Sequence, residues 1–243
     1  MTAPWRPRTA LVTGAAGGYG SALVRRLRLS GCEVLALARR AESVRARPGR
    51  DGAPLAALHV VEADVTSENC GHRVAEALGS TGWSSLDLLV NAAGVVRIGP
   101  ELATVQASDV LASLDVHCVG ALRVVRAAVP WLERGERPVV ANISSRHGSL
   151  DIVAGGGIPN VPVSYSYRIA KAAQNMLTAC LHQEFAPRMR VLAVHPGLMS
   201  TSIAPGDADR TAAQAADELL TMLAGAPDAS GVFLTPPGTV LPW

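Results

Sequence analysis

Short apolar runs alternate with longer helical patterns along almost the whole chain, and this alternation is the strongest constraint on its fold. Seven runs have the length and composition of buried strands: residues 9–12, 33–38, 58–62, 86–90, 138–143, 191–194 and 232–234. Apolar residues three or four positions apart predict helices at residues 21–29, 67–78, 105–132, 167–185 and 211–223. The alternation indicates right-handed βαβ units and therefore an α/β fold, with a doubly wound seven-stranded parallel sheet and helices on both faces.

The composition fits one globular domain that spans residues 1–243. No repeat or linker interrupts the pattern, and 243 residues suffice for a well-buried core. With 49% hydrophobic and 17% charged residues, the chain is not of the disordered class. Its formal net charge of +2 gives no reason to expect a nucleic-acid or membrane partner, and we interpret the arginines at positions 39–50 as a solvated loop.

The cysteines and the apolar runs predict a cytoplasmic protein. No apolar run reaches the roughly 18 residues that a transmembrane helix needs. Thr13 and Gly14 interrupt the first apolar run, so no signal peptide is expected. The four cysteines lack CxxC spacing, which is typical of buried, reduced thiols, and we expect no metal site: Cys32, Cys70, Cys118 and Cys180.

A glycine-rich turn joins the first strand to the first helix. Its sequence, Thr-Gly-Ala-Ala-Gly-Gly-Tyr-Gly, covers residues 13–20. The glycines permit a tight turn and a close approach of the backbone to a ligand, and the exposed helix N-terminus then faces a pyrophosphate. Placed after the first strand of a βαβ unit, the turn predicts a dinucleotide site that includes Gly14, Gly18, Tyr19 and Gly20.

Tyr167 and Lys171 are four positions apart on a predicted helix, so they lie on one face, a turn apart. An ammonium group favours the phenolate. We therefore expect Lys171 to lower the pKa of Tyr167 and to let the phenol exchange a proton near neutral pH. The alternative is a surface pair without a function, because a Tyr-x-x-x-Lys pattern alone is common.

Together the two motifs resemble those of the classical short-chain dehydrogenase/reductase family, over about residues 8–235. The resemblance implies a single-domain Rossmann fold with NAD(H) or NADP(H) as the cofactor. Three further runs are similar to the C-factor and sniffer-type carbonyl reductase branch: Tyr-Arg-x-x-Lys-Ala-Ala-x-Asn-Met-Leu, Ser-Ser-Arg-x-Gly-Ser and a C-terminal Leu-Pro-Trp. That branch implies an NADPH-dependent carbonyl reductase without fixing its substrate.

The resemblance also assigns further cofactor contacts. Asp64, followed by Val65, matches the aspartate that contacts the adenine ring. Residues 91–94 resemble the family's Asn-Asn-Ala-Gly turn, and residues 196–201 resemble the segment that closes over the nicotinamide. The residues concerned in these two segments are Asn91, Ala93, Gly94, Pro196, Gly197, Met199 and Thr201.

The same resemblance implies how three side chains would act on a carbonyl that receives a hydride. Tyr167 would protonate the carbonyl oxygen, and Lys171 would assist the tyrosine and hold the nicotinamide ribose hydroxyls. Ser145 would donate a hydrogen bond to the same oxygen and polarise the carbonyl. Ser144 is the alternative for this role, although the family register favours the second serine.

Three nearby side chains are weaker candidates for catalysis. Tyr165 lacks a lysine four positions later, and we interpret it as lining of the pocket. His147 follows the serine pair and His195 precedes the Pro-Gly segment. His147 could line the pocket, but we interpret both histidines as structural rather than catalytic.

The chain departs from the family pattern at two places. His117 replaces the family's catalytic asparagine, whose main-chain carbonyl is thought to hold a water joined to the lysine. Three interpretations stay open: a backbone role that survives the substitution, a proton relay through the imidazole, or a residue that packs under the sheet and weakens turnover. Residues 151–162, rich in glycine and proline, lengthen the distance from Ser145 to Tyr167 and either shape the substrate pocket or are disordered padding.

Cofactor choice is expected at the end of the second strand, where NAD enzymes place an acid against the ribose 2′-hydroxyl. Here Ala38 is followed by Arg39 and Arg40. The missing acid and the two guanidiniums favour a 2′-phosphate, with Arg39 as its main contact, and therefore NADP(H) over NAD(H). The alternative is that both arginines are ordinary exposed side chains.

These features predict an NADPH-dependent oxidoreductase that interconverts a carbonyl and an alcohol on a small organic substrate. Because of His117, the alternative is a catalytically weak or repurposed NADP(H)-binding relative, with a regulatory or scaffold role or an atypical reaction such as epimerisation. The sequence does not name the substrate, its stereochemistry or the physiological direction.

We also expect a homodimer or homotetramer, because family members commonly pair through the helices at residues 105–132 and 167–185. Small side chains on these helices would permit close packing between subunits, unless they face only the sheet: Ala121, Ala127, Ala128, Ala172, Ala173 and Ala179.

Overall fold

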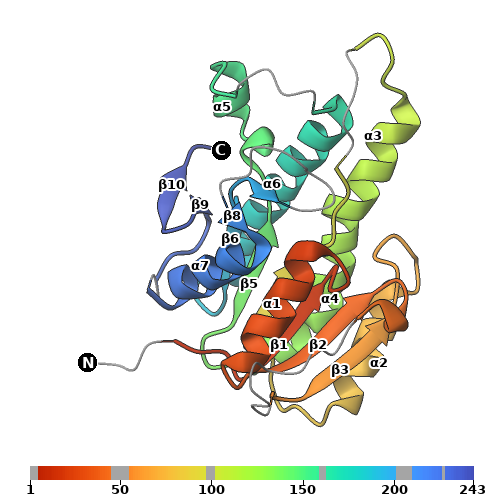
Figure 1. The fold of residues 1–243 in the computed structure, drawn as a ribbon, viewed down its shortest axis with the longest axis vertical. Helices are drawn as coiled ribbons and strands as arrows, with labels where there is room; N and C mark the ends of the chain where they lie inside the picture. Colours follow the sequence, from red (N-terminus) through yellow and green to blue (C-terminus); the bar gives the residue numbers. More distant parts are fainter. Residues whose placement is uncertain (1–4, 45–54, 97–101, 159–162, 201–209, 226–227) are drawn as a thin grey trace.

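The computed structural model describes residues 5–44, 55–96, 102–158, 163–200, 210–225 and 228–243 (Figure 1). Within these ranges, eight strands form a central sheet: β1 (Thr9–Thr13), β2 (Glu33–Ala38), β3 (Leu58–Glu62), β4 (Leu88–Asn91), β5 (Val139–Ile143), β6 (Arg190–Val194), β9 (Val232–Thr235) and β10 (Thr239–Leu241). Their order across the sheet is β10-β9-β6-β5-β4-β1-β2-β3. The first seven in chain order run parallel, as the sequence predicts, and β10 pairs antiparallel with β9.

The edge strand β10 is an addition to the predicted sheet. Its three residues follow a Pro-Pro-Gly turn and are mostly exposed, so they form no apolar run that the sequence could indicate. A separate parallel pair, β7 (Met199–Ser200) and β8 (Arg210–Thr211), lies beyond the end of β6.

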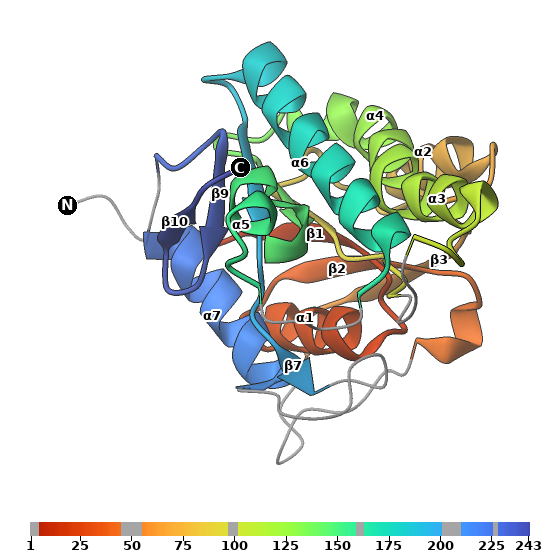
Figure 2. The ribbon, with the colours of Figure 1, turned by 90° about the horizontal axis from the view of Figure 1, so that it is seen from above.

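Helices cover both faces of the sheet (Figure 2): α1 (Gly18–Leu29), α2 (Cys70–Ser80), α3 (Ala107–Leu114), α4 (Gly120–Leu132), α5 (Leu150–Ala154), α6 (Tyr165–Phe185) and α7 (Ala212–Gly225). Alternate residues of each strand face opposite layers. Val12 and Val34 belong to the core under α1 and α7, whereas Leu11 and Leu35 belong to the core under α2, α4 and α6. The predicted doubly wound architecture is thus confirmed.

The helix predicted at residues 105–132 is broken in the middle. A π-helical turn, η3 (Asp115–Val119), separates α3 from α4 and carries His117. In this turn the N–H of Gly120 reaches the carbonyl of Asp115. Such turns interrupt the regular hydrogen-bond ladder and occur often at functional sites.

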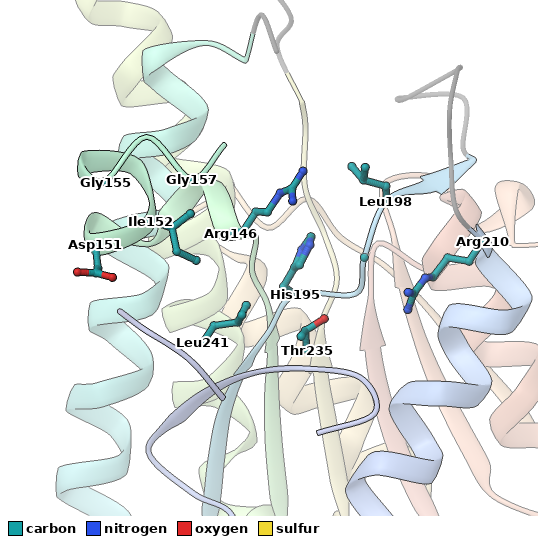
Figure 3. A pocket seen from close by; sticks show the side chains of 11 residues that line it. Arg146, Asp151, Ile152, Gly155, Gly157, His195, Leu198, Arg210, Thr235 and Leu241 are labelled. Carbon is teal, nitrogen blue, oxygen red and sulfur yellow. The ribbon is translucent and has the colours of Figure 1, made fainter. Parts of the chain in front are cut away.

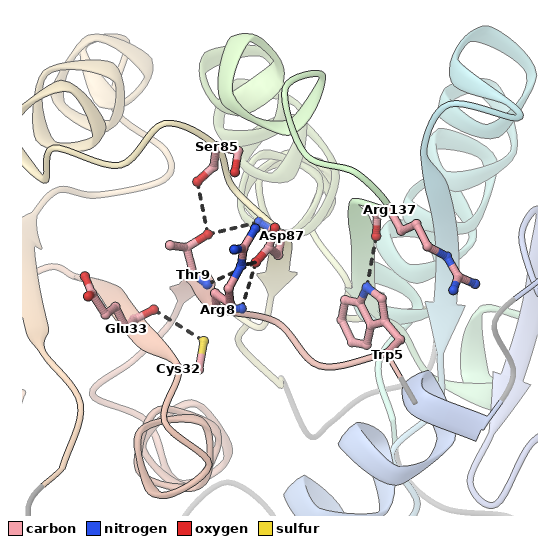
Figure 4. A network of polar contacts seen from close by, with 8 residues as sticks. All are labelled: Trp5, Arg8, Thr9, Cys32, Glu33, Ser85, Asp87 and Arg137. Carbon is pink, nitrogen blue, oxygen red and sulfur yellow. Dashed lines mark hydrogen bonds and ion pairs between the residues drawn. The ribbon is translucent and has the colours of Figure 1, made fainter. Parts of the chain in front are cut away.

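A polar network fixes the register of β1 against β4 at the amino ends of the strands (Figure 4). The carboxylate of Asp87 accepts N–H bonds from Arg8 at 2.7 Å and from Thr9 at 3.3 Å. Nearby, the indole N–H of Trp5 donates to the carbonyl of Arg137 at 3.0 Å. These contacts hold one end of the sheet and leave the carboxyl ends of the strands for other roles.

The cysteines only partly match the expectation of buried thiols. All four are free, and Cys32 and Cys70 are buried, but Cys118 is half-buried and Cys180 is exposed on α6. The error arises because Cys180 lies on the outer side of a helix that buries only one face. Among the described residues, no helix combines the length and the apolarity needed to cross a bilayer.

Candidate functional site

A cleft of about 660 Å³ opens at the carboxyl ends of the parallel strands. It lies where the strand order reverses, because β1 pairs with β2 on one side and β4 on the other. Ligands of open α/β sheets bind in such positions. The predicted cofactor residues that line the cleft are Gly14, Gly18, Tyr19, Gly20, Arg39, Asp64, Val65, Ala93, Gly94, Tyr167, Lys171, Pro196, Gly197 and Met199.

Two predicted cofactor residues fall outside this list. Asn91 is buried behind the cleft, where its side-chain amide donates to the Oδ1 atom of Asn142 at 2.8 Å and so ties β4 to β5. Thr201 lies outside the described residues.

The turn after β1 is held directly against the turn after β4. Gly14 has a φ of +65°, and a Cβ atom there would lie 2.8 Å from the Cα of Ala93. The hydroxyl of Thr13 accepts N–H bonds from Ala92 and Ala93, both at 3.0 Å. Thr13, which opens the glycine-rich motif, therefore positions the second turn, a role that the motif alone does not indicate.

The first helix begins without a side-chain cap. Gly17 is its N-cap residue and makes no capping bond, so amides of the first turn lack an intrahelical partner. These amides and the positive end of the helix dipole suit a pyrophosphate. The ring of Tyr19 is buried in the core near α7, and burial followed by the nearby Glu218 carboxylate raises the pKa of its phenol.

The far end of the cleft carries Asp64 and Arg39. The Oδ1 atom of Asp64 accepts bonds from the amide and the hydroxyl of Thr66, at 2.9 and 2.8 Å. The hydrogen bond from the backbone N–H of Thr66 contributes most to lowering the pKa of Asp64, and the charge of the Arg39 guanidinium lowers it further. Arg40 does not line the cleft but lies 3.9 Å from the carboxylate of Glu42, so only one of the two arginines faces the cofactor region.

Lys171 is buried at the other end of the cleft, one turn beyond Tyr167 on α6. Its ammonium donates to the carbonyl of Ile143 at 2.6 Å and to the Oε1 atom of Gln174 at 2.9 Å. Burial lowers the pKa of Lys171 to about 7. Gln174 was missed by sequence reasoning, although its position three residues after the lysine is a signal that could have found it.

The expected lowering of the Tyr167 pKa is wrong for this arrangement. Burial raises the pKa of Tyr167 to about 12, and a hydrogen bond with Ser145 opposes this rise. The ammonium of Lys171 lies 5.7 Å from the ring centroid of Tyr167 and is occupied by its own acceptors. The phenol is therefore protonated at neutral pH.

The two serines after β5 have different surroundings. Ser144 donates to the Oδ1 atom of Asn175 at 2.5 Å, and the amide of Asn175 donates to the carbonyl of Gly148 at 3.1 Å. This network ties the strand end to α6. Ser145 instead bonds with Tyr167, which favours it over Ser144 as the serine near the reacting atoms.

His117 lies in the wall of the cleft and not under the sheet. Its Nε2 atom is 2.9 Å from the carbonyl oxygen of Val95, and its Nδ1 atom is buried without a partner. Burial, followed by the charge of Lys171, lowers the pKa of His117 to about 3. A Cβ atom at Gly94 would lie 2.8 Å from the imidazole, so a glycine is required there.

Of the three remaining aromatic candidates, the two histidines line the cleft and Tyr165 does not. Tyr165 is 46% exposed and lines neither the cleft nor the groove beside it, so the expectation that it lines the pocket is wrong. Residues two positions apart on a helix point about 200° apart. His147 and His195 do line the cleft, and burial is the main cause that lowers the pKa of each to about 4.

A groove of about 590 Å³ adjoins the cleft (Figure 3). Part of its wall is the segment at residues 151–162, which begins within α5 and whose residues 159–162 lie outside the described ranges. Ser149 caps α5 by accepting the N–H of Ile152 at 3.0 Å. The described part of the segment therefore shapes a cavity.

Proteins of known sequence or structure resemble the chain over most of its length. A family model described as short chain dehydrogenase matches residues 8–211. The C-signal protein of Myxococcus xanthus is 33% identical over 160 residues, which are 65% of this chain and 93% of that protein. The 1-hydroxy-2-glutathionyl-2-methyl-3-butene dehydrogenase of Rhodococcus sp. (strain AD45) is 32% identical over 244 residues, 97% of this chain and 99% of that protein. The carbonyl reductase Sniffer of D. melanogaster superposes with a TM-score of 0.82 at 22% identity, covering 97% of this chain and 99% of that chain.

Proposed function

The chain belongs to the short-chain dehydrogenase family, and on that premise we propose that it is an NADPH-dependent oxidoreductase that interconverts a carbonyl and an alcohol, with Tyr167 as the proton donor and acceptor. The predicted likeness to the C-factor and sniffer-type branch is confirmed by the relatives found. The substrate is a small organic molecule that reaches the cleft beside the tyrosine.

One observation carries the proposal: Ser145, Tyr167, Lys171 and His117 all line one end of the cleft. The Gly14 turn and the uncapped start of α1 form its other wall. A ligand that spans the cleft therefore has backbone amides for its phosphates and a phenol for the oxygen of a substrate. A nicotinamide cofactor would supply the hydride.

The roles of the side chains follow from their protonation. The phenol of Tyr167, with its pKa raised to about 12, holds a proton that it can donate to the oxygen of a carbonyl. The hydrogen bond with Ser145 stabilises the phenolate that remains. Lys171, with its pKa lowered to about 7, can gain or lose a proton near neutral pH. In its protonated form it would stabilise the same phenolate by its charge.

The residues that would hold the cofactor follow the cleft from end to end. Arg39 would bind a 2′-phosphate, and Asp64 with Val65 would contact the adenine. The first turn of α1 would bind the pyrophosphate. Lys171 would donate to the ribose hydroxyls next to the nicotinamide, in place of one of its present acceptors.

The test offers the protein a panel of ketones and aldehydes and measures their reduction as the loss of NADPH absorbance. Tyr167→Phe should lower turnover by about a hundredfold or more and leave NADPH affinity nearly unchanged, because the proton donor is lost but the ring stays. The matched control is Tyr165→Phe, which should keep full activity. Lys171→Ala should weaken both turnover and NADPH binding. An inactive Tyr165→Phe beside an active Tyr167→Phe would show that the tyrosine is wrongly assigned.

A further inference from the structure

The groove beside the cleft is continuous with the end at which the proposed reaction takes place. Arg146, His195, Gly197 and Leu198 line both cavities. Arg146 directly follows Ser145, the serine that bonds with Tyr167. A molecule whose carbonyl lies at Tyr167 can therefore extend into the groove, where it meets Arg146.

Arg146 has no charge partner among the residues that the structure describes. Its Nε atom is buried and makes no hydrogen bond. Figure 3 shows the Arg146 side chain extending into the groove between Ile152 and Leu198, while the carboxylate of Asp151 points away from it. Arg146 as a whole is half-buried, but a buried N–H of its guanidinium without an acceptor is costly, and an anionic ligand would relieve that cost.

The other polar side chains of the groove leave the charge of Arg146 unbalanced. Arg210 also lines the groove, but it forms an ion pair with Glu218. His195 presents a buried Nδ1 atom without a partner, and burial together with the neighbouring arginines keeps its pKa low, so the ring is neutral. Of the charged residues that line the groove, Arg146 is thus the one that an anion would meet.

From these contacts we propose that the groove binds a carboxylate through Arg146, so that the preferred substrates are carbonyl compounds that also carry an acid group. The inference rests on the proposed function and names its substrate class. A guanidinium binds a planar carboxylate through two parallel hydrogen bonds. A single unpaired cation suits a monoanion better than a phosphate dianion, and Ile152, Leu198 and Leu241 offer apolar contacts to the carbon chain.

The first experiment compares oxo acids with their methyl esters as substrates, using 2-oxopentanoate, 4-oxopentanoate and 5-oxohexanoate with NADPH. The protein should favour at least one acid over its ester, and Arg146→Gln should lower kcat/KM for that acid by about tenfold to a hundredfold. The ester should change by less than about threefold, since it makes no charge-assisted bond. Arg146→Lys should retain part of the preference, because it keeps the charge but loses the paired geometry.

Arg188→Gln is the matched control, because it also removes one positive charge but from an exposed ion pair with Glu133. It should leave the preference for the acid unchanged. Equal losses for acid and ester in Arg146→Gln, or the same loss in Arg188→Gln, would overturn the proposal.

A second readout separates the anion site from the reaction. Calorimetric titration of 4-oxopentanoate, 2-oxopentanoate and 5-oxohexanoate into the protein measures binding without turnover. One outcome separates the two proposals: no carbonyl is reduced, yet one of these acids binds more tightly than its ester, and Arg146→Gln weakens the binding of that acid about tenfold. In that case the proposed function fails and the carboxylate site stands. If none of the acids binds better than its ester, and none is preferred as a substrate, the carboxylate site is refuted whatever the enzyme reduces.

Discussion

The imidazole of His117 stands edge-on to the ring of Tyr167, with the centroids 5.4 Å apart and the planes at 86°. The histidine therefore packs behind the proposed proton donor and supports the orientation of its ring. Its Nε2 atom contacts the backbone of Val95, and its pKa of about 3 keeps the ring neutral at every pH near neutrality. A neutral ring tied to the backbone is a poor proton relay, so the geometry favours the interpretation in which only the main chain of residue 117 takes part in catalysis.

We predict that His117→Asn keeps turnover within about tenfold of the unchanged protein, which corresponds to roughly 1.4 kcal/mol of barrier. The backbone of the η3 turn remains, and the lost ring does not titrate between pH 6 and 7. The measurement is kcat/KM against pH for a carbonyl substrate, in which no limb near pH 6 to 7 should disappear.

Two outcomes of this experiment would count against the backbone interpretation. A loss above about tenfold, with fold and NADPH affinity intact, would assign a role to the imidazole itself. If neither protein reduces any carbonyl while both bind NADPH, the catalytically weak or repurposed alternative gains support.

The buried histidines should make the protein sensitive to acid. The unfolded chain takes up protons below about pH 6.5, whereas the pKa values of about 3 for His117 and about 4 for His147 keep both rings neutral in the folded state. The free energy of unfolding should therefore fall as the pH decreases from 6.5 toward 4, by up to about 1.4 kcal/mol per pH unit for each histidine.

Urea unfolding at several pH values between 7 and 5 checks this dependence. His117→Asn should reduce the slope by about one proton, and His72→Asn, which changes an exposed side chain on α2, should leave it unchanged. An unaltered slope in His117→Asn would contradict the low pKa of this histidine.

The sequence predicts the layers and the cleft because both depend on local patterns. The apolar runs that form β1, β2, β4, β5 and β6 are almost wholly buried, so strand propensity and hydrophobicity agree there. The Gly14 turn and the Tyr167–Lys171 pair carry their own spacing, which places them on a turn and on one helix face before any packing is known.

The features that the sequence does not predict depend on contacts between distant residues. The pKa of Tyr167 rises because burial outweighs the hydrogen bond with Ser145, and burial is a property of the whole fold. Gln174 and Asn175 hold Lys171 and Ser144 only after α6 packs beside the end of β5. The groove at Arg146 likewise needs α5, β8 and β10 to meet, and these elements are far apart in the chain.

Cofactor preference should depend on Arg39. The protein should bind NADPH more tightly than NADH, because the Arg39 guanidinium lines the cleft where a 2′-phosphate would lie and no acid follows β2. Arg39→Asp should reverse or abolish the preference, by repelling the phosphate and accepting a ribose hydroxyl. The 4 tryptophans allow both titrations by intrinsic fluorescence.

Arg40→Asp is the matched control and should have a smaller effect, since Arg40 lies outside the cleft. Equal or tighter binding of NADH by the unchanged protein would contradict the prediction.

The structure changes which side chains can take part in subunit assembly. Ala121 and Ala128 are buried within the subunit, so the expected contacts through these alanines are wrong. Larger apolar side chains on α3, η3, α4 and α6 are exposed instead: Leu111, Val119, Leu122, Ile169 and Met176. Burying Leu or Met side chains of this size stabilises an interface by about 1.5–3 kcal/mol each, which favours a homo-oligomer.

Light scattering should therefore give a multiple of 25.2 kDa at micromolar concentration. The double variant Leu122→Lys with Met176→Lys should give a mass near 25.2 kDa, because two ammonium groups would have to leave water at the interface. Leu29→Lys, which changes an exposed leucine on α1, is the control and should leave the mass unchanged. A mass near 25.2 kDa for the unchanged protein would reject the oligomer, and dissociation by Leu29→Lys alone would move the interface to the opposite face of the sheet.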